Sequence, residues 1–167
     1  QIKQTLTNLE IFQIFKNNKK VVLFLIQNDI ITISQEIYDE ILNKIESNGT
    51  RYCHFFIPEL EKFSGEKQMK NIKDKLLKED SNIFTNYEEK RKTGENDSNI
   101  CSLIREDSID DFISHISRQN ISPSSEIPPS IFETNQFLIS QKNTSLIEYS
   151  AFFGSIQIFR YLRNKID

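Results

Sequence analysis

Apolar residues recur every three or four positions along much of the chain, which is the spacing of one face of an α-helix. The pattern is clearest between residues 143 and 162, where Ser145 and Glu148 have the S-x-x-E spacing of a capping box. Gly154 can adopt a left-handed backbone, so it predicts the end of one helix, and Ser155 can cap the next. The apolar residues of this second helix recur at three-residue steps: Ile156, Phe159 and Leu162. The stretch therefore predicts two short helices joined by a tight turn, which must pack against neighbours to be stable.

This stretch resembles the core of an ankyrin repeat, T-P-L-H-x-A-A-x-x-G-H-x-x-V-V-x-x-L-L. The residues that carry the repeat signature are Ser145, Glu148, Ala151, Gly154 and Leu162, supported by Ile147, Ile158, Phe159 and Tyr161. The chain departs from the pattern at four positions: Leu146 replaces Pro, Glu148 replaces the first His, Ser150 replaces the first Ala and Ser155 replaces the second His. The sequence of residues 145–162 is also similar to that of a divergent ankyrin-like domain of uncharacterised role, found in greatly expanded protist protein families. The resemblance implies an array of antiparallel helix pairs.

A second copy of the pattern begins near Gly94, since a shift of 47 residues aligns the two copies. The aligned pairs are Ile100 with Ile147, Asp107 with Gly154, Ser108 with Ser155, Ile109 with Ile156, and Phe112 with Phe159. Asp tolerates the left-handed turn that Gly favours. The 47-residue spacing exceeds the 33-residue ankyrin period, which requires an insertion. Residues 120–142 contain Pro128 and Pro129 and predict a long, partly ordered excursion, with a plain loop as the alternative.

The first part of the chain, residues 1–93, predicts further helices with weaker signals. Thr7 and Glu10 form another possible capping box, and Asn17 and Asn18 separate two apolar stretches, with Asn17 expected in a left-handed conformation. Setting Asn17 on the ankyrin Gly makes this pair a third copy; the alternative is an ordinary buried helical hairpin.

Three more segments complete this part. A helix is expected over 35–46, with Ile37, Ile41 and Ile45 on one apolar stripe and Asn48-Gly49 as its stop. Residues 51–65 predict an aromatic-rich segment folded against the helices. Residues 66–79 predict an amphipathic helix with Met69, Ile72 and Leu76 inward. The mixed charges of 88–92 predict a solvated helix end.

Composition agrees with one all-α domain over residues 1–167, and the resemblance implies that this domain is a degenerate ankyrin-like solenoid. Of the 167 residues, 27% are charged and 37% hydrophobic, and there are only four glycines and four prolines. The net charge of −3 gives no general attraction to nucleic acid, and the longest apolar run, residues 21–26, is too short for a membrane span. Two cysteines, without a visible signal peptide, favour a reducing, cytoplasmic location. Because the chain starts at Gln1 without Met, we expect a fragment of a longer protein. We also expect further repeats after Asp167, because a terminal repeat normally has a polar outer face and the last helix pair is apolar on more than one side, at Ile156, Ile158, Phe159, Tyr161 and Leu162.

Candidate catalytic chemistry is sparse. Cys53-His54 and Cys101 with His115 are the only pairs of nucleophile and base by type, and their surroundings resemble packing segments. The sequence contains neither a C-x-x-C zinc motif nor a glycine-rich phosphate loop. We therefore expect a non-enzyme without cofactor or metal; an enzyme would need a pocket that joins these cysteines and histidines.

The function expected from the resemblance is a scaffold that binds a protein partner of unknown identity. In an ankyrin repeat the two variable positions before the Gly often lie on the concave binding face; here they are Phe152 and Phe153, and Arg105 and Glu106 in the other copy. The competing expectation is that one of the two, Phe152 rather than Phe153, packs against the neighbouring repeat. The alternative function is a structural or regulatory domain that joins larger parts, with both phenylalanines buried.

Overall fold

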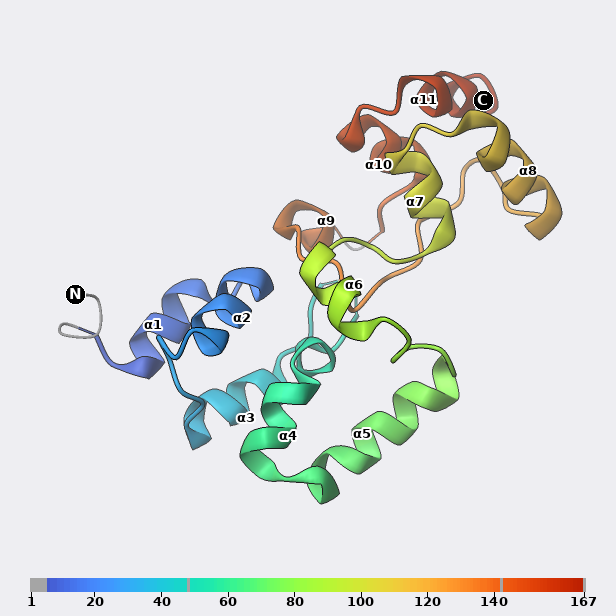
Figure 1. Cartoon of the computed structure of the whole chain (residues 1–167). Coiled ribbons are helices and arrows are strands. Elements are labelled where there is room, and N and C mark those ends of the chain that lie inside the picture. The colour runs from blue at the N-terminus through green and yellow to red at the C-terminus, as the bar shows by residue number, and fades with distance from the viewer. Residues whose placement is uncertain (1–5, 48, 142, 167) are drawn as a thin grey trace.

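The computed structural model describes residues 6–47, 49–141 and 143–166, and the regular secondary structure of this part of the chain is helical. It contains eleven α-helices and a 3-10 helix, and in place of strands it has two isolated bridges, Ile45 with Arg51 and Glu126 with Ser145. The predicted all-α class is confirmed for these residues. Helices α1 to α5 form one group and α7, α8, α10 and α11 form another, with α6 and α9 between them (Figure 1).

The first helix pair begins and ends at local polar signals. Helix α1 (Asn8–Phe15) starts at the predicted capping box, because the Thr7 hydroxyl accepts from the Glu10 amide and the Glu10 carboxylate accepts from the Thr7 amide. Helix α2 (Lys19–Gln27) follows. The expected left-handed Asn17 was wrong, since neither asparagine has a positive φ. The Asn18 side chain instead caps α2 by accepting from the Val21 amide at 3.1 Å.

Helix α3 (Gln35–Asn43) is shorter than predicted. Lys44 leaves the helical region at ψ 123°, and the next residue, Ile45, pairs with Arg51 in an antiparallel bridge. Ile45 is therefore 63% exposed and does not extend the buried stripe of the helix, contrary to the prediction. The sequence predicted that Asn48 and Gly49 end this helix. Asn48 lies outside the described residues, and Gly49 has a φ of 84°.

The aromatic segment that follows forms the centre of the first hydrophobic core. It folds into the 3-10 helix η2 (Tyr52–Phe55) and α4 (Ile57–Ser64), and α5 (Glu66–Glu79) then packs on α4. The fully buried aromatic side chains of this core are Phe12, Tyr52, Phe55 and Phe56. Met69 and Leu76 of α5 are buried as predicted, with Ile72 partly buried against the same core.

A buried charged side chain holds α6 against the first group of helices. Helix α6 (Tyr87–Thr93) carries Arg91, which is completely buried between the rings of Phe55 and Tyr87 and forms an ion pair with Glu59 at 2.6 Å. The predicted solvated end of this helix is therefore wrong at Arg91. An arginine can be buried here because the guanidinium has a carboxylate partner and stacks on aromatic faces.

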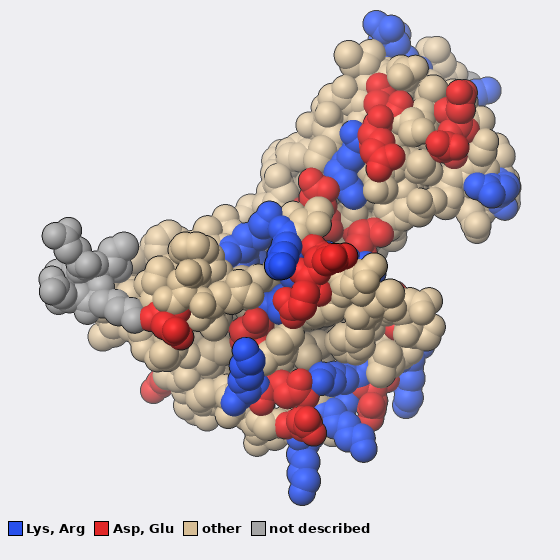
Figure 2. Space-filling view, viewed as in Figure 1, with Lys and Arg blue, Asp and Glu red and all other residues tan. Residues whose placement is uncertain are grey.

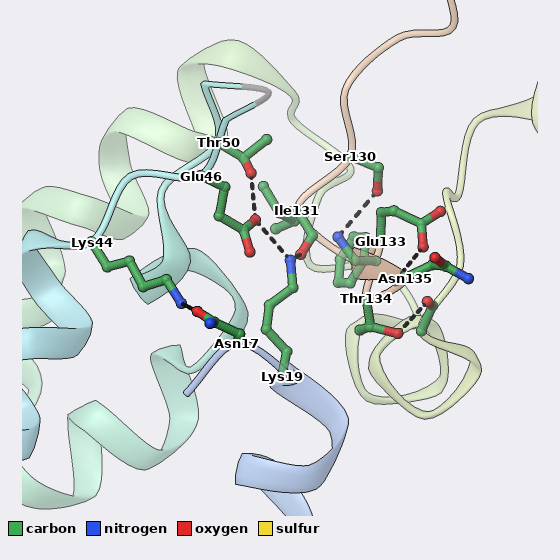
Figure 3. A network of polar contacts seen from close by, with 12 residues as sticks. Asn17, Lys19, Lys44, Glu46, Thr50, Ser130, Ile131, Glu133, Thr134 and Asn135 are labelled. Atoms are coloured by element: carbon green, nitrogen blue, oxygen red, sulfur yellow. Dashed lines mark hydrogen bonds and ion pairs between the residues drawn. The ribbon is translucent and has the colours of Figure 1, made fainter. Parts of the chain in front are cut away.

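A second buried charge holds the excursion against the first group. The Lys19 ammonium of α2 lies 2.9 Å from the Glu46 carboxylate and donates to the Ile131 carbonyl at 3.1 Å (Figure 3). Residues 130–135 are thereby fixed, with Phe132 buried against the Tyr87 ring. The predicted excursion over 120–142 contains one short helix, α9 (Gln136–Ser140), and its described residues connect the two groups. Lys142 lies outside the described residues.

The second group consists of two similar helix hairpins. Helices α7 (Asn99–Arg105) and α8 (Ile109–Gln119) form one, and α10 (Leu146–Phe153) and α11 (Ile156–Arg163) form the other. The helices of the second hairpin start 47 residues after those of the first, as the alignment predicted. Asp107 and Gly154 have left-handed φ values of 50° and 70° at matching turns.

The buried face of α11 differs from the prediction. Ile158 and Leu162 are fully buried, whereas Ile156 is 58% exposed and Phe159 is half-buried. Buried positions therefore recur at a four-residue step rather than at the predicted three-residue steps. Together with α7, α8 and α10, these residues form a second hydrophobic core, whose members include Ile104, Phe112, Leu146 and Tyr149.

Candidate interaction surface

An exposed group of aromatic side chains lies where α9 meets α10. Its members, here called the aromatic surface, are Phe137, Phe152 and Phe153. The rings of Phe137 and Phe152 are stacked, with centroids 5.5 Å apart and planes at 7°, while Phe153 meets Phe152 edge-on at 5.0 Å. Phe137 is 56% exposed and Phe152 is 40% exposed. Rigid aromatic rings present a large apolar area at low entropic cost, which suits them to protein recognition.

Local sequence signals place Phe152 and Phe153 in the last turn of α10. The helix starts at the predicted capping box, in which the Glu148 carboxylate accepts from the Ser145 amide at 2.8 Å and its own amide donates to the Ser145 hydroxyl at 3.3 Å. These hydrogen bonds lower the pKa of Glu148, so the cap is ionised at neutral pH. The helix ends at Gly154, whose left-handed conformation is the predicted stop.

The two remaining signature residues, Leu162 and Ala151, differ in burial, and the neighbouring Ser155 joins the two hairpins. Leu162 is buried in the second core, whereas Ala151 is exposed on the outer side of α10. Ser155, one of the departures from the ankyrin pattern, is buried, and its hydroxyl donates to the Ile104 carbonyl of α7. The two hairpins are therefore tied together at their turns by a polar contact as well as by apolar packing.

The relative burial of the two phenylalanines is opposite to the competing expectation that Phe152 packs against the neighbouring repeat. Phe153 is half-buried, because its ring packs on Tyr149 with centroids 4.7 Å apart. Phe152, which was expected to pack inward, is the more exposed of the two. The difference follows from helix geometry: Phe153 lies four residues after the buried Tyr149 and so shares its face, whereas Phe152 is rotated by about 100° from it.

Arg105 contacts the residues on which the aromatic surface packs. Its guanidinium donates to the Asn96 carbonyl at 2.9 Å and to the Tyr149 hydroxyl at 2.8 Å, forms an ion pair with Glu95 at 2.9 Å, and lies 6.0 Å from the Phe153 ring centroid. Only 16% of the side chain is exposed. The sequence predicts Arg105 as a contact for a partner, and the structure shows its guanidinium in contact with Tyr149 and Phe153.

Glu106, the fourth candidate, is exposed next to the α7–α8 turn. Its backbone amide donates to the Ser102 carbonyl at 3.0 Å and closes the helix. The described contacts do not join its carboxylate to the aromatic surface. The structure thus brings together Phe152, Phe153 and Arg105 and leaves Glu106 apart.

Phe137 is the member of the surface that sequence reasoning missed. Helix α9 has only five residues, and it is anchored by buried Leu138 and Ile139 and by an Asn135 cap that accepts from the Phe137 amide at 3.0 Å. The signal available in the sequence was an apolar stretch, Phe137 to Ile139, inside a region otherwise typical of a loop. In a helix of five residues, the buried Leu138 and Ile139 occupy the inner face, and Phe137 lies on the exposed side.

The cysteines and histidines are not assembled into a common site. Cys53 is buried in η2 and Cys101 in α7, and burial raises the pKa of both thiols, that of Cys101 to about 11. A thiol with a raised pKa is protonated at neutral pH and is a poor nucleophile. The His115 ring shares a hydrogen bond with the Asn99 amide at 3.1 Å. Within the described residues, no three His, Cys, Asp or Glu side chains are grouped closely enough to hold a metal ion.

Charges of both signs are interspersed over the face seen in Figure 2, without a single-sign field. Across the described ranges, no helix has the length and apolar character needed to cross a bilayer. Comparisons with protein-family models, with curated proteins and with solved structures found no match to this chain.

Proposed function

We propose that this chain is a non-catalytic protein-interaction scaffold of the ankyrin-repeat type, and that the aromatic surface is its partner-binding region. The observation that carries the proposal is the exposed Phe137–Phe152 stack, 5.5 Å between centroids, held on two helices with buried anchors. Stacked rings that are 56% and 40% exposed cost hydration free energy unless a partner covers them.

The arrangement supports recognition because it is pre-organised. Tyr149, Arg105 and Phe153 form a packed and hydrogen-bonded base, so that Phe152 loses little rotamer freedom when a partner binds. An apolar segment with an aromatic or aliphatic anchor would fit such a surface. The alternative, a joining domain without a partner, requires both phenylalanines to be buried, and the exposure of Phe152 counts against it. The proposal places the chain in a reducing, cytoplasmic compartment, since both described cysteines are free thiols.

The test is a pull-down from native extract with the wild-type chain and with Phe137→Ser/Phe152→Ser. Both sites are exposed, so the variant should keep the helix content and thermal stability of the wild type, measured by circular dichroism. The matched control is Phe24→Ser, because Phe24 is 57% exposed on α2, in the other group of helices. A protein retained by wild type and by the control and lost with the double variant supports the proposal. Equal retention by all three would refute it.

A further inference from the structure

A second exposed apolar feature lies on the outer side of the last hairpin. A groove of about 270 Å³ lies between α10 and α11. It is lined by Ser150, Ala151, Gly154, Ser155, Ile156, Phe159, Arg160 and Arg163. Ile156 is 58% exposed and Phe159 is half-buried. The groove is distinct from the aromatic surface: none of Phe137, Phe152 and Phe153 lines it.

The equivalent face of the preceding hairpin is already an interface. Shifting back by 47 residues takes Ala151, Gly154 and Phe159 to Ile104, Asp107 and Phe112. Each of these three residues contacts the next hairpin. The Ile104 carbonyl accepts from the Ser155 hydroxyl, and the Asp107 carboxylate accepts from a backbone amide at the start of α11. The Phe112 ring packs edge-on against the Tyr161 ring, with centroids 6.3 Å apart. The groove therefore continues an interface that helices α10 and α11 occupy one step earlier.

The capping contact shows how closely the first interface is specified. The Asp107 carboxylate accepts from the backbone amides of Gln157 at 3.1 Å and Ile158 at 3.0 Å, which are otherwise free at the start of α11. At the corresponding position Gly154 has no side chain, and a Cβ there would meet nothing within 4 Å. A helix that docks in the groove thus finds an apolar floor and open space, without a fixed cap.

The charged residues at the border of the groove indicate which kind of partner it would bind. Arg160 and Arg163 stand where the first hairpin has Ile113 and Ile116, and both arginines are exposed. An apolar floor bordered by two cations is complementary to an apolar stripe bordered by carboxylates. A second copy of the chain would bring the same arginines close together around a two-fold axis, which is repulsive.

We infer that the α10–α11 groove binds an acidic amphipathic helix of a partner protein. This inference rests on the proposed scaffold function, since it names the chemistry of a partner, but it concerns a different surface. The apolar stripe of the partner helix would lie on Ile156 and Phe159, and its Asp or Glu side chains would pair with Arg160 and Arg163.

The probe is a synthetic amphipathic helix of about 20 residues with leucines on one face and glutamates along both edges. Its binding to the wild-type chain is measured by fluorescence anisotropy. Ile156→Ser should weaken binding at least about tenfold, as expected for loss of an interface anchor. The matched control is Ile45→Ser, because Ile45 is 63% exposed in the other group of helices and should leave binding unchanged.

Charge reversal tests the border independently of the floor. Arg160→Glu/Arg163→Glu should weaken binding of the glutamate helix about tenfold and strengthen binding of the same helix carrying lysines. Arg118→Glu is the control, because Arg118 is exposed on α8 of the preceding hairpin and should change neither. Binding that is insensitive to all these changes would overturn the inference.

Three further outcomes separate the alternatives. Loss of peptide binding in Phe137→Ser/Phe152→Ser, with full binding in Ile156→Ser, would overturn the groove assignment and leave the aromatic surface as the binding region. A dimer in sedimentation velocity that dissociates with Ile156→Ser would identify a second copy as the occupant. A longer natural chain that does not bind the peptide, while residues 1–167 do, would identify a following segment of the same chain as the occupant and would overturn the assignment to a partner protein.

Discussion

Replacing Lys19 by Met should be one of the most destabilising single changes in the chain. The ammonium lies 2.9 Å from the Glu46 carboxylate and 3.1 Å from the Ile131 carbonyl, and the two charged side chains are only 1% and 3% exposed (Figure 3). Burial lowers the pKa of Lys19 and the nearby Glu46 charge raises it, so the ammonium depends on that carboxylate. Without the Lys19 ammonium, Glu46 becomes a buried charge that keeps the hydrogen bond from the Thr50 hydroxyl at 2.8 Å.

The magnitude follows from what remains after the substitution. Breaking a buried ion pair from one side costs about 3 to 5 kcal/mol, and the Thr50 hydrogen bond that Glu46 keeps places Lys19→Met near the lower limit, at about 3 kcal/mol. For a chain of this size the melting temperature should fall by about 6 to 12 °C. The surface pair of Lys16 with Glu40, whose side chains are 36% and 38% exposed, provides the comparison: Lys16→Met should cost less than about 1 kcal/mol.

Urea denaturation of four proteins measures the coupling: the wild type, Lys19→Met, Glu46→Gln and the double variant. Glu46→Gln alone leaves the Lys19 ammonium buried without its counter-charge, so it should also be costly. The double variant removes both charges and should be more stable than the sum of the single effects predicts, by about 2 kcal/mol. Additive effects, or a Lys19→Met cost no larger than that of Lys16→Met, would refute the reasoning.

Two substitutions at turns test the backbone argument. Gly94→Ala should destabilise the protein by about 2 kcal/mol, because the added Cβ would lie 2.7 Å from two side-chain atoms and the backbone is left-handed. Gly154→Ala should cost only about 1 kcal/mol, because its backbone is also left-handed but the added Cβ would meet nothing within 4 Å. Equal costs of the two substitutions in urea denaturation would contradict this reasoning. Asp107→Ala should remove the cap of α11, cost about 1 to 2 kcal/mol, and lower hydrogen-exchange protection near Gln157 and Ile158; unchanged protection would show that the cap is unimportant.

Features that depend on near neighbours in the sequence were predicted well. The capping boxes at Thr7 and Ser145 and the left-handed turns at Asp107 and Gly154 each involve residues within a few positions of one another. Because such contacts form within one turn of chain, the residue types alone specify them. Asn17 was the exception: Asn can adopt the left-handed conformation, but it can also precede a helix that is capped by its neighbour.

Features that depend on distant partners could not be predicted. Arg91 was predicted at a solvated helix end, and no neighbour of Lys19 in the sequence indicates that it is buried. Both side chains are buried because a carboxylate and an aromatic ring come from other segments. The partners are Glu46 and Phe55 for Lys19, and Glu59 and Phe55 for Arg91. For the same reason the aromatic surface was predicted only in part. Phe152 and Phe153 came from the repeat pattern, but the stacking of Phe137 depends on how the excursion folds back onto α10.

The comparison of the two hairpins bears directly on what the last one does. A hairpin that ended a stack against solvent would be expected to have polar residues along its whole outer face. Here the border has changed from Ile113 and Ile116 to Arg160 and Arg163, whereas Ile156 and Phe159 keep an apolar floor at the positions of Ile109 and Phe112. An apolar floor left open costs hydration free energy, and a charged border discriminates between partners at little cost in stability. The combination is typical of a binding face rather than of a solvated end, and the paired charge-reversal experiment separates these two interpretations, because a solvated end would bind neither peptide.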